Sequence, residues 1–87
     1  MLFHITHVHT IDQCPARNPE LMRASYGEMI ESAKGLGVRW VGIWVDSPAH
    51  TVFMVAEAET VYQLEKLLAP VTRIGHAEVK PVFSGLS

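Results

Sequence analysis

The sequence predicts an α+β fold with the element order β-α-β-β-α-β and a four-stranded antiparallel sheet. Four segments rich in β-branched and aromatic residues predict strands over 2–9, 38–46, 50–57 and 72–83. Apolar residues at helical spacing follow the first and third of these segments. The 87 residues are the size of one small domain, so we expect residues 1–87 to form a single domain.

The first strand and the first helix have clear sequence signals. Residues 2–9 read Leu-Phe-His-Ile-Thr-His-Val-His, which favours a strand, and the polar residues 10–18 indicate a loop. Asn18-Pro19-Glu20 predicts a helix start, because Asn caps, Pro suits the first helical position and Glu favours the positive end of the helix dipole. Gly35 and Gly37 are expected to end this helix.

The second and third strands are predicted to form a hairpin. Val38–Asp46 and His50–Glu57 flank a short turn at Ser47-Pro48-Ala49. Simple alternation along the second strand places Trp40 and Trp44 on one face. The two indoles are then expected to line an apolar pocket or to fill a dimer core.

The second helix and the last strand complete the order. Thr60 and Gln63 match a capping box, and Pro70 is expected to end the helix. In the last strand His76 and Glu78 share a face, so they are a candidate acid–base pair. The alternative is an ordinary salt-bridged strand surface, because Lys80 continues the same face.

This order is the ferredoxin-like arrangement, with strand one between strands three and four. Both helices are expected to cover one face of the sheet. Hydrophobic residues make up 48% of the chain, and the uncovered face carries apolar residues of its own. A second copy of the chain would cover that face, so we expect a homodimer.

Composition excludes several classes of partner. The net charge is −2 and no block of Lys or Arg appears, which argues against nucleic acid. No apolar run approaches the ~18 residues of a membrane-spanning segment, and the N-terminus does not resemble a signal peptide. The single cysteine, Cys14, excludes an internal disulfide and favours a cytoplasmic location.

Several short motifs resemble those of muconolactone isomerase. They are Met1-Leu2-Phe3-His4 followed by Ile5, the tryptophan-bearing second strand, Val52-Phe53, Thr60-Val61 with Leu64, and Ala77-Glu78-Val79. The resemblance covers most of the chain and implies the dimeric α+β barrel group, which includes isomerases and cofactor-free monooxygenases. Among the polar positions only His4 matches, so the resemblance assigns no catalytic set.

Histidines gather at one edge of the predicted sheet. His7 and His9 are two residues apart on a strand, so they share a face with Cα atoms ~6.5 Å apart. Topology brings His50, at the start of the third strand, and His76, early in the fourth strand, to the same edge. The loop bearing Cys14 leaves from this edge as well.

Three functions are compatible with this pattern. The first is binding of a transition metal, such as nickel, zinc, copper or iron, through these histidines with Cys14 as an optional ligand. The second is cofactor-free isomerisation or oxygenation of a small, apolar, aromatic-derived compound, with a histidine moving the proton. The third is a sulfur carrier at Cys14-Pro15. The structural alternative is that the histidines are half-buried and hydrogen-bonded to neighbours, and His4, which faces away from His7, is expected to pack.

Overall fold

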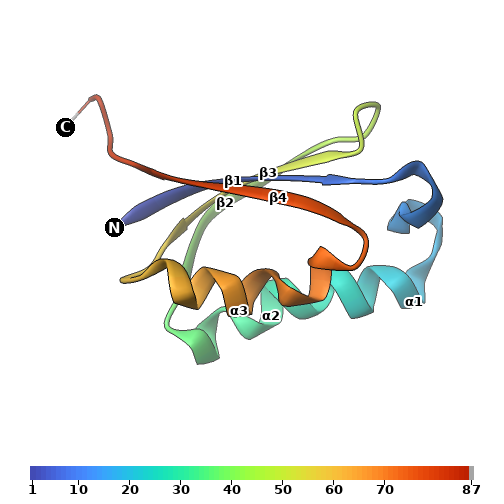
Figure 1. Ribbon diagram of the computed structural model, residues 1–87, viewed down its shortest axis with the longest axis horizontal. Helices are drawn as coiled ribbons and strands as arrows, with labels where there is room; N and C mark the ends of the chain where they lie inside the picture. Colours follow the sequence, from blue (N-terminus) through green and yellow to red (C-terminus); the bar gives the residue numbers. More distant parts are fainter. Residues whose placement is uncertain (87) are drawn as a thin grey trace.

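The computed structural model describes residues 1–86. Strands β1 (Leu2–His9), β2 (Arg39–Asp46), β3 (Thr51–Glu57) and β4 (Gly75–Val82) form one antiparallel sheet in the order β2-β3-β1-β4. The helices lie together on one face of this sheet (Figure 1). The predicted α+β fold is confirmed, including the position of β1 between β3 and β4.

The first helical segment is continuous but not uniform. It consists of α1 (Pro19–Met22), a π-helical turn (Arg23–Gly27) and α2 (Glu28–Ser32). Short 3₁₀ turns precede it at Ile11–Gln13 and Pro15–Arg17 and follow it at Lys34–Leu36. The predicted cap is present, because the Asn18 side chain accepts a hydrogen bond from the Leu21 amide at 3.1 Å.

Helix α3 (Val61–Thr72) begins as predicted and ends later than predicted. At its start the Gln63 side-chain oxygen accepts a hydrogen bond from the Thr60 amide at 2.9 Å. The expected end at Pro70 is wrong, because the helix runs through this residue. A proline removes one backbone donor, and the fully buried Val71 holds the last turn against the core. As a result β4 starts at Gly75 rather than at residue 72.

Strand β2 contains a bulge that the sequence pattern does not reveal. Trp40 pairs with Ala56 and Gly42 pairs with Val55, so Val41 is an extra residue on β2. A bulge of this kind shifts the alternation of side chains by one position.

The bulge separates the two tryptophans. Trp40 lies on the side that faces the helices, where its Nε1 donates to the Ile30 carbonyl at 3.2 Å. Trp44 projects from the opposite side and is 55% exposed. The prediction that the two indoles share a face is therefore wrong, and Ile43 and Val45 occupy the helix-facing positions nearer the hairpin.

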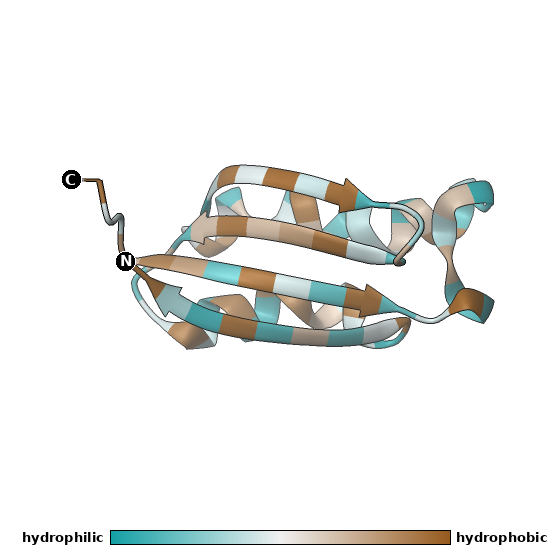
Figure 2. Ribbon diagram, turned by 90° about the horizontal axis from the view of Figure 1, so that it is seen from above, coloured by the Kyte–Doolittle hydropathy of each residue, from teal (hydrophilic) through white to brown (hydrophobic). Residues whose placement is uncertain are grey.

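The core lies between the sheet and the helical layer. Its largest fully buried apolar side chains come from both layers and are Ile5, Met29, Met54, Leu64, Leu67 and Val71. On the face away from the helices, the sheet has no helix over it, and apolar and polar residues alternate along its strands (Figure 2). The exposed large apolar residues on that open face include Val8, Trp44, Phe53 and Val82. Among residues 1–86 no helix has the length and hydropathy to cross a membrane.

Candidate metal centre and adjoining cavity

His7 and His9 share a face of β1, as predicted, and both project toward the helical layer. His7 is completely buried, and its Nε2 lies 2.8 Å from the Val71 carbonyl oxygen. Its Nδ1 lies 2.6 Å from the Tyr26 hydroxyl. Because a carbonyl can only accept, Nε2 carries the ring hydrogen, and Nδ1 of the neutral ring accepts from Tyr26.

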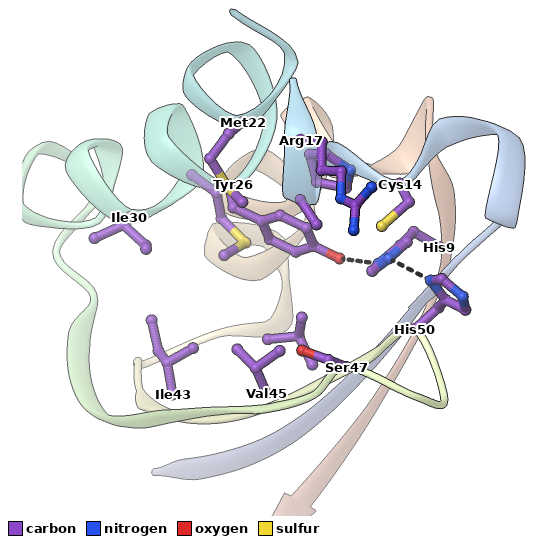
Figure 3. Close-up of a pocket in the computed structure, with 14 residues that line it drawn as sticks. His9, Cys14, Arg17, Met22, Tyr26, Ile30, Ile43, Val45, Ser47 and His50 are labelled. Atoms are coloured by element: carbon purple, nitrogen blue, oxygen red, sulfur yellow. Dashed lines mark hydrogen bonds between the residues drawn. The ribbon is translucent and has the colours of Figure 1, made fainter. Parts of the chain in front are cut away.

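The same logic fixes the hydrogen on His9. The Tyr26 hydroxyl has one hydrogen, which it gives to His7. The His9 Nδ1 lies 3.0 Å from that hydroxyl oxygen and must therefore donate to it. Neutral His9 is left with a lone pair on Nε2, and this nitrogen faces His50 (Figure 3).

Three potential metal ligands meet at this point. His9, Cys14 and His50 each offer one ligand atom, and these atoms all lie within 4.8 Å of one another. The His9 Nε2 and His50 Nδ1 are 3.3 Å apart. Two nitrogens bound to one tetrahedral zinc at ~2.0–2.1 Å would be about 3.3 Å apart, so this spacing suits a shared ion as well as a hydrogen bond.

His50 is presented by the β2–β3 hairpin rather than by strand β3 itself. Its backbone φ is 51°, in the left-handed region, and it is a turn residue preceding Thr51. The His50 amide donates to the Ser47 carbonyl at 3.1 Å, and the His50 carbonyl accepts from the His9 amide at 3.0 Å. These two backbone bonds hold the His50 ring next to the end of β1.

Cys14 is partly buried and lies between the two 3₁₀ turns that follow β1. The structure does not place it at the N-terminus of α1, because the cap of that helix is Asn18. The electrostatic basis of the sulfur-carrier hypothesis, a thiol at a helix N-terminus, is therefore missing at α1. Cys14 instead faces the two imidazoles of the site.

Burial favours the neutral form of His7 and His9. It lowers the pKa of His7 and of His9 below the usual value, and the neighbouring His50 lowers the pKa of His9 further. Burial also raises the pKa of the Tyr26 hydroxyl, so this group keeps its hydrogen. Neutral imidazole is the form that binds metal ions.

The structure does not bring every predicted site residue together. His7 shares the face of His9, but both of its ring nitrogens are engaged in hydrogen bonds, so neither is free to bind a metal ion. His76 pairs with Val8 across β1 and β4, so it projects from the open face and does not join His9. Glu78 projects from the same open face.

His4 faces away from His7, as predicted, and so lies on the open face, with its ring 6.4 Å from that of Phe53. Neither Trp40 nor Trp44 lines the cavity beside the metal-ligand group. Trp40 packs against the core, and the Trp44 ring lies over Gly42. The predicted indole-lined pocket is thus replaced by an aliphatic one.

A cavity of about 500 Å³ adjoins His9, Cys14 and His50. It lies between the α1–α2 segment and strands β2 and β3 (Figure 3). Its walls are mostly apolar and include Met22, Met29, Ile30, Ile43, Val45 and Val52. The three potential ligands form its polar end.

Two residues of this site had no clear signal in the sequence. Tyr26 lies at helical spacing in the sequence, which by itself predicts only a core residue, but its hydroxyl is buried between His7 and His9. The π-helical turn that carries Tyr26 is not encoded by a simple spacing, although such turns are frequent at functional sites. Arg17, which lines the cavity near Cys14, resembles any other loop arginine in the sequence.

Comparison with known families identifies the family of this chain. A family model described as "Domain of unknown function (DUF3303)" matches residues 1–85. The chain belongs to the DUF3303 family. No curated protein matches the sequence of this DUF3303 chain.

Solved structures share the fold of this DUF3303 protein. An uncharacterised NIPSNAP domain protein from Burkholderia xenovorans superposes with a TM-score of 0.62 at 17% identity, covering 100% of this chain and 98% of that chain. SCO4226 from Streptomyces coelicolor A3(2) gives a TM-score of 0.60 at 16% identity, covering 91% and 94%. At these identities the similarity shows the fold of the DUF3303 protein.

Proposed function

We propose that this DUF3303 protein binds a transition metal ion through His9, Cys14 and His50. The observation that carries the proposal is the convergence of their three ligand atoms. The hydrogen-bond chain from Val71 through His7 and Tyr26 supports it, because this chain leaves the His9 Nε2 lone pair directed at the site. Outer hydrogen bonds of this kind orient metal-binding histidines in many proteins.

The ligand set narrows the choice of ion. Two imidazoles and one thiolate suit zinc, nickel, copper or iron and do not suit magnesium or calcium. Three protein ligands leave a fourth tetrahedral position for water or a small molecule. A reducing cytoplasm, which the single cysteine favours, would keep Cys14 reduced and so available to bind a metal ion.

Cobalt titration of metal-free protein tests this proposal. We expect one equivalent of Co²⁺ to produce a thiolate-to-cobalt charge-transfer absorption that Zn²⁺ then displaces. Cys14→Ser should lose this band, and His50→Ala should weaken the affinity by about tenfold or more. His76→Ala is the matched control, since this histidine lies on the open face, and it should behave like the wild type.

Two results would contradict the proposal. One is the absence of a stoichiometric metal in stripped and reloaded protein, measured by elemental analysis. The other is a charge-transfer band that persists in Cys14→Ser.

A second function is favoured by the cavity itself. We infer that a small, apolar, aromatic-derived compound could be isomerised or oxygenated there without a cofactor, as the resemblance to muconolactone isomerase implies. His9 lies at the cavity end and is joined through Tyr26 to His7, so it could move a proton. Turnover that survives Cys14→Ser and metal removal but is lost in His9→Gln would favour this function over metal binding.

A further inference from the structure

The cavity combines an apolar body with one cationic residue at its polar end. The Arg17 side chain points to the end where Cys14 and His9 lie (Figure 3). None of the fourteen described residues that line the cavity carries a carboxylate. Among residues 1–86 one ion pair is present, between Arg39 and Glu57, and Arg17 forms no ion pair. An anion entering this cavity would therefore meet a free positive charge and no like charge.

The size and walls of the cavity indicate what kind of uncharged group would fill it. About 500 Å³ lies within the range of small-molecule sites. This space corresponds to on the order of fifteen water volumes at ~30 Å³ each, so it suits a body of one or two rings or a medium hydrocarbon chain. The walls farthest from the polar end include the aliphatic side chains of Ile30 and Ile43 (Figure 3).

We propose that this cavity binds a small organic carboxylic acid, with its apolar body against Ile30 and Ile43 and its carboxylate at Arg17. The proposal goes beyond metal binding, because Arg17 supplies the charge whether or not an ion is held by His9, Cys14 and His50. Arginine suits this task, since its planar guanidinium can pair with both oxygens of a carboxylate.

The test uses two probes of nearly identical shape, 2-naphthoate and 2-naphthalenemethanol. Binding is measured by calorimetry on metal-free full-length protein in the presence of a chelator. We expect the carboxylate to bind more tightly than the alcohol. Arg17→Ala should weaken naphthoate binding by roughly three- to fivefold and leave the alcohol unchanged. Arg23→Ala is the matched control, because this exposed arginine does not line the cavity.

The position of the probe is followed by backbone amide NMR. Shifts over residues 22–30 and 43–45 would support the proposal. Equal affinities for acid and alcohol in the wild type, or shifts clustered around Phe53 on the open face, would overturn it. The chelator separates the two proposals, because naphthoate binding by the metal-free protein requires no ion at His9, Cys14 and His50. A failed cobalt titration would therefore leave the expected naphthoate binding unchanged.

Discussion

Tyr26 is the residue on which the arrangement of both buried histidines depends. Its hydroxyl donates to His7 and accepts from His9. The Val71 carbonyl fixes which nitrogen of His7 carries the hydrogen. Through Tyr26 this also fixes which nitrogen of His9 carries its hydrogen. Removing the hydroxyl would leave one buried acceptor and one buried donor without a partner.

Tyr26→Phe should consequently affect both stability and the site. We expect a loss of about 1–3 kcal/mol in the free energy of unfolding, measured by urea denaturation of the metal-free protein. We also expect metal affinity to fall by roughly tenfold, because His9 can adopt the other tautomer. Tyr62→Phe is the control, since Tyr62 is 70% exposed on α3 and should change neither quantity. Unchanged affinity in Tyr26→Phe would show that the tautomer does not matter.

The lowered pKa values of His7 and His9 predict how stability depends on pH. A group whose pKa is lower in the folded state than in the unfolded state binds more protons when unfolded. Stability is therefore full above the ordinary histidine pKa of about 6.5 and is lost as the pH falls below it. The lowered pKa of Glu57 acts only at more acidic pH.

Thermal unfolding of metal-free protein from pH 8 to pH 5 measures this dependence. We expect a plateau down to about pH 7 and a decline in Tm below it. His7→Gln should show a flatter decline than the wild type, because it removes one of the two groups. An equally steep decline in that variant would assign the pH dependence to other groups.

At the scale of elements, the close approach of β4 to β1 holds the end of the strand that carries His9. A Cβ atom on Gly75 would clash with the Val8 carbonyl oxygen and lie 2.6 Å from the His9 Cα. These are backbone atoms, which cannot move without disturbing the strand pairing. A Cβ on Gly42 would instead meet the Trp44 ring at 2.6 Å, at the far end of a flexible side chain.

The two glycines should therefore respond differently to alanine. Gly75→Ala is expected to cost on the order of 3 kcal/mol in the free energy of unfolding, measured by chemical denaturation. Gly42→Ala should cost clearly less, because Trp44 can rotate away toward solvent. A similar cost at both positions would mean that the strands can separate at Gly75.

The elements also show what the sequence can and cannot predict. Strand alternation correctly placed His7 and His9 on one face and His4 on the other, because β1 is regular. The same rule failed for Trp44 after the bulge at Val41, since valine suits a regular strand and a bulge equally well. In β4 the rule correctly placed His76 and Glu78 on one face. It could not say which face of the sheet that is, because a one-residue change of register between β1 and β4 would reverse every side chain.

At the scale of the whole molecule, the open face of the sheet exposes large apolar side chains that nothing among residues 1–86 of the single chain covers. Trp44, Phe53 and Val8 are exposed there, whereas the helices cover the other face. The homodimer expected from the sequence remains a prediction, and this face is where we expect two copies to meet.

Light scattering after size-exclusion chromatography tests this expectation. The wild type should have the mass of a dimer, and Phe53→Lys should shift it to a monomer by placing a charge at the contact. Phe53 is 36% exposed in the single chain, so the fold should tolerate the change. Tyr62→Lys, on the exposed side of α3, should remain dimeric. A monomeric wild type would exclude the dimer.

The left-handed backbone at His50 has a consequence for how this protein could be altered. A non-glycine residue in that conformation costs of order 1 kcal/mol, which glycine would not incur. Selection in the laboratory for heat resistance alone should therefore favour Gly or Asn at position 50. Selection for retention of a metal should favour histidine. The two selections would therefore yield different residues at position 50 of the hairpin.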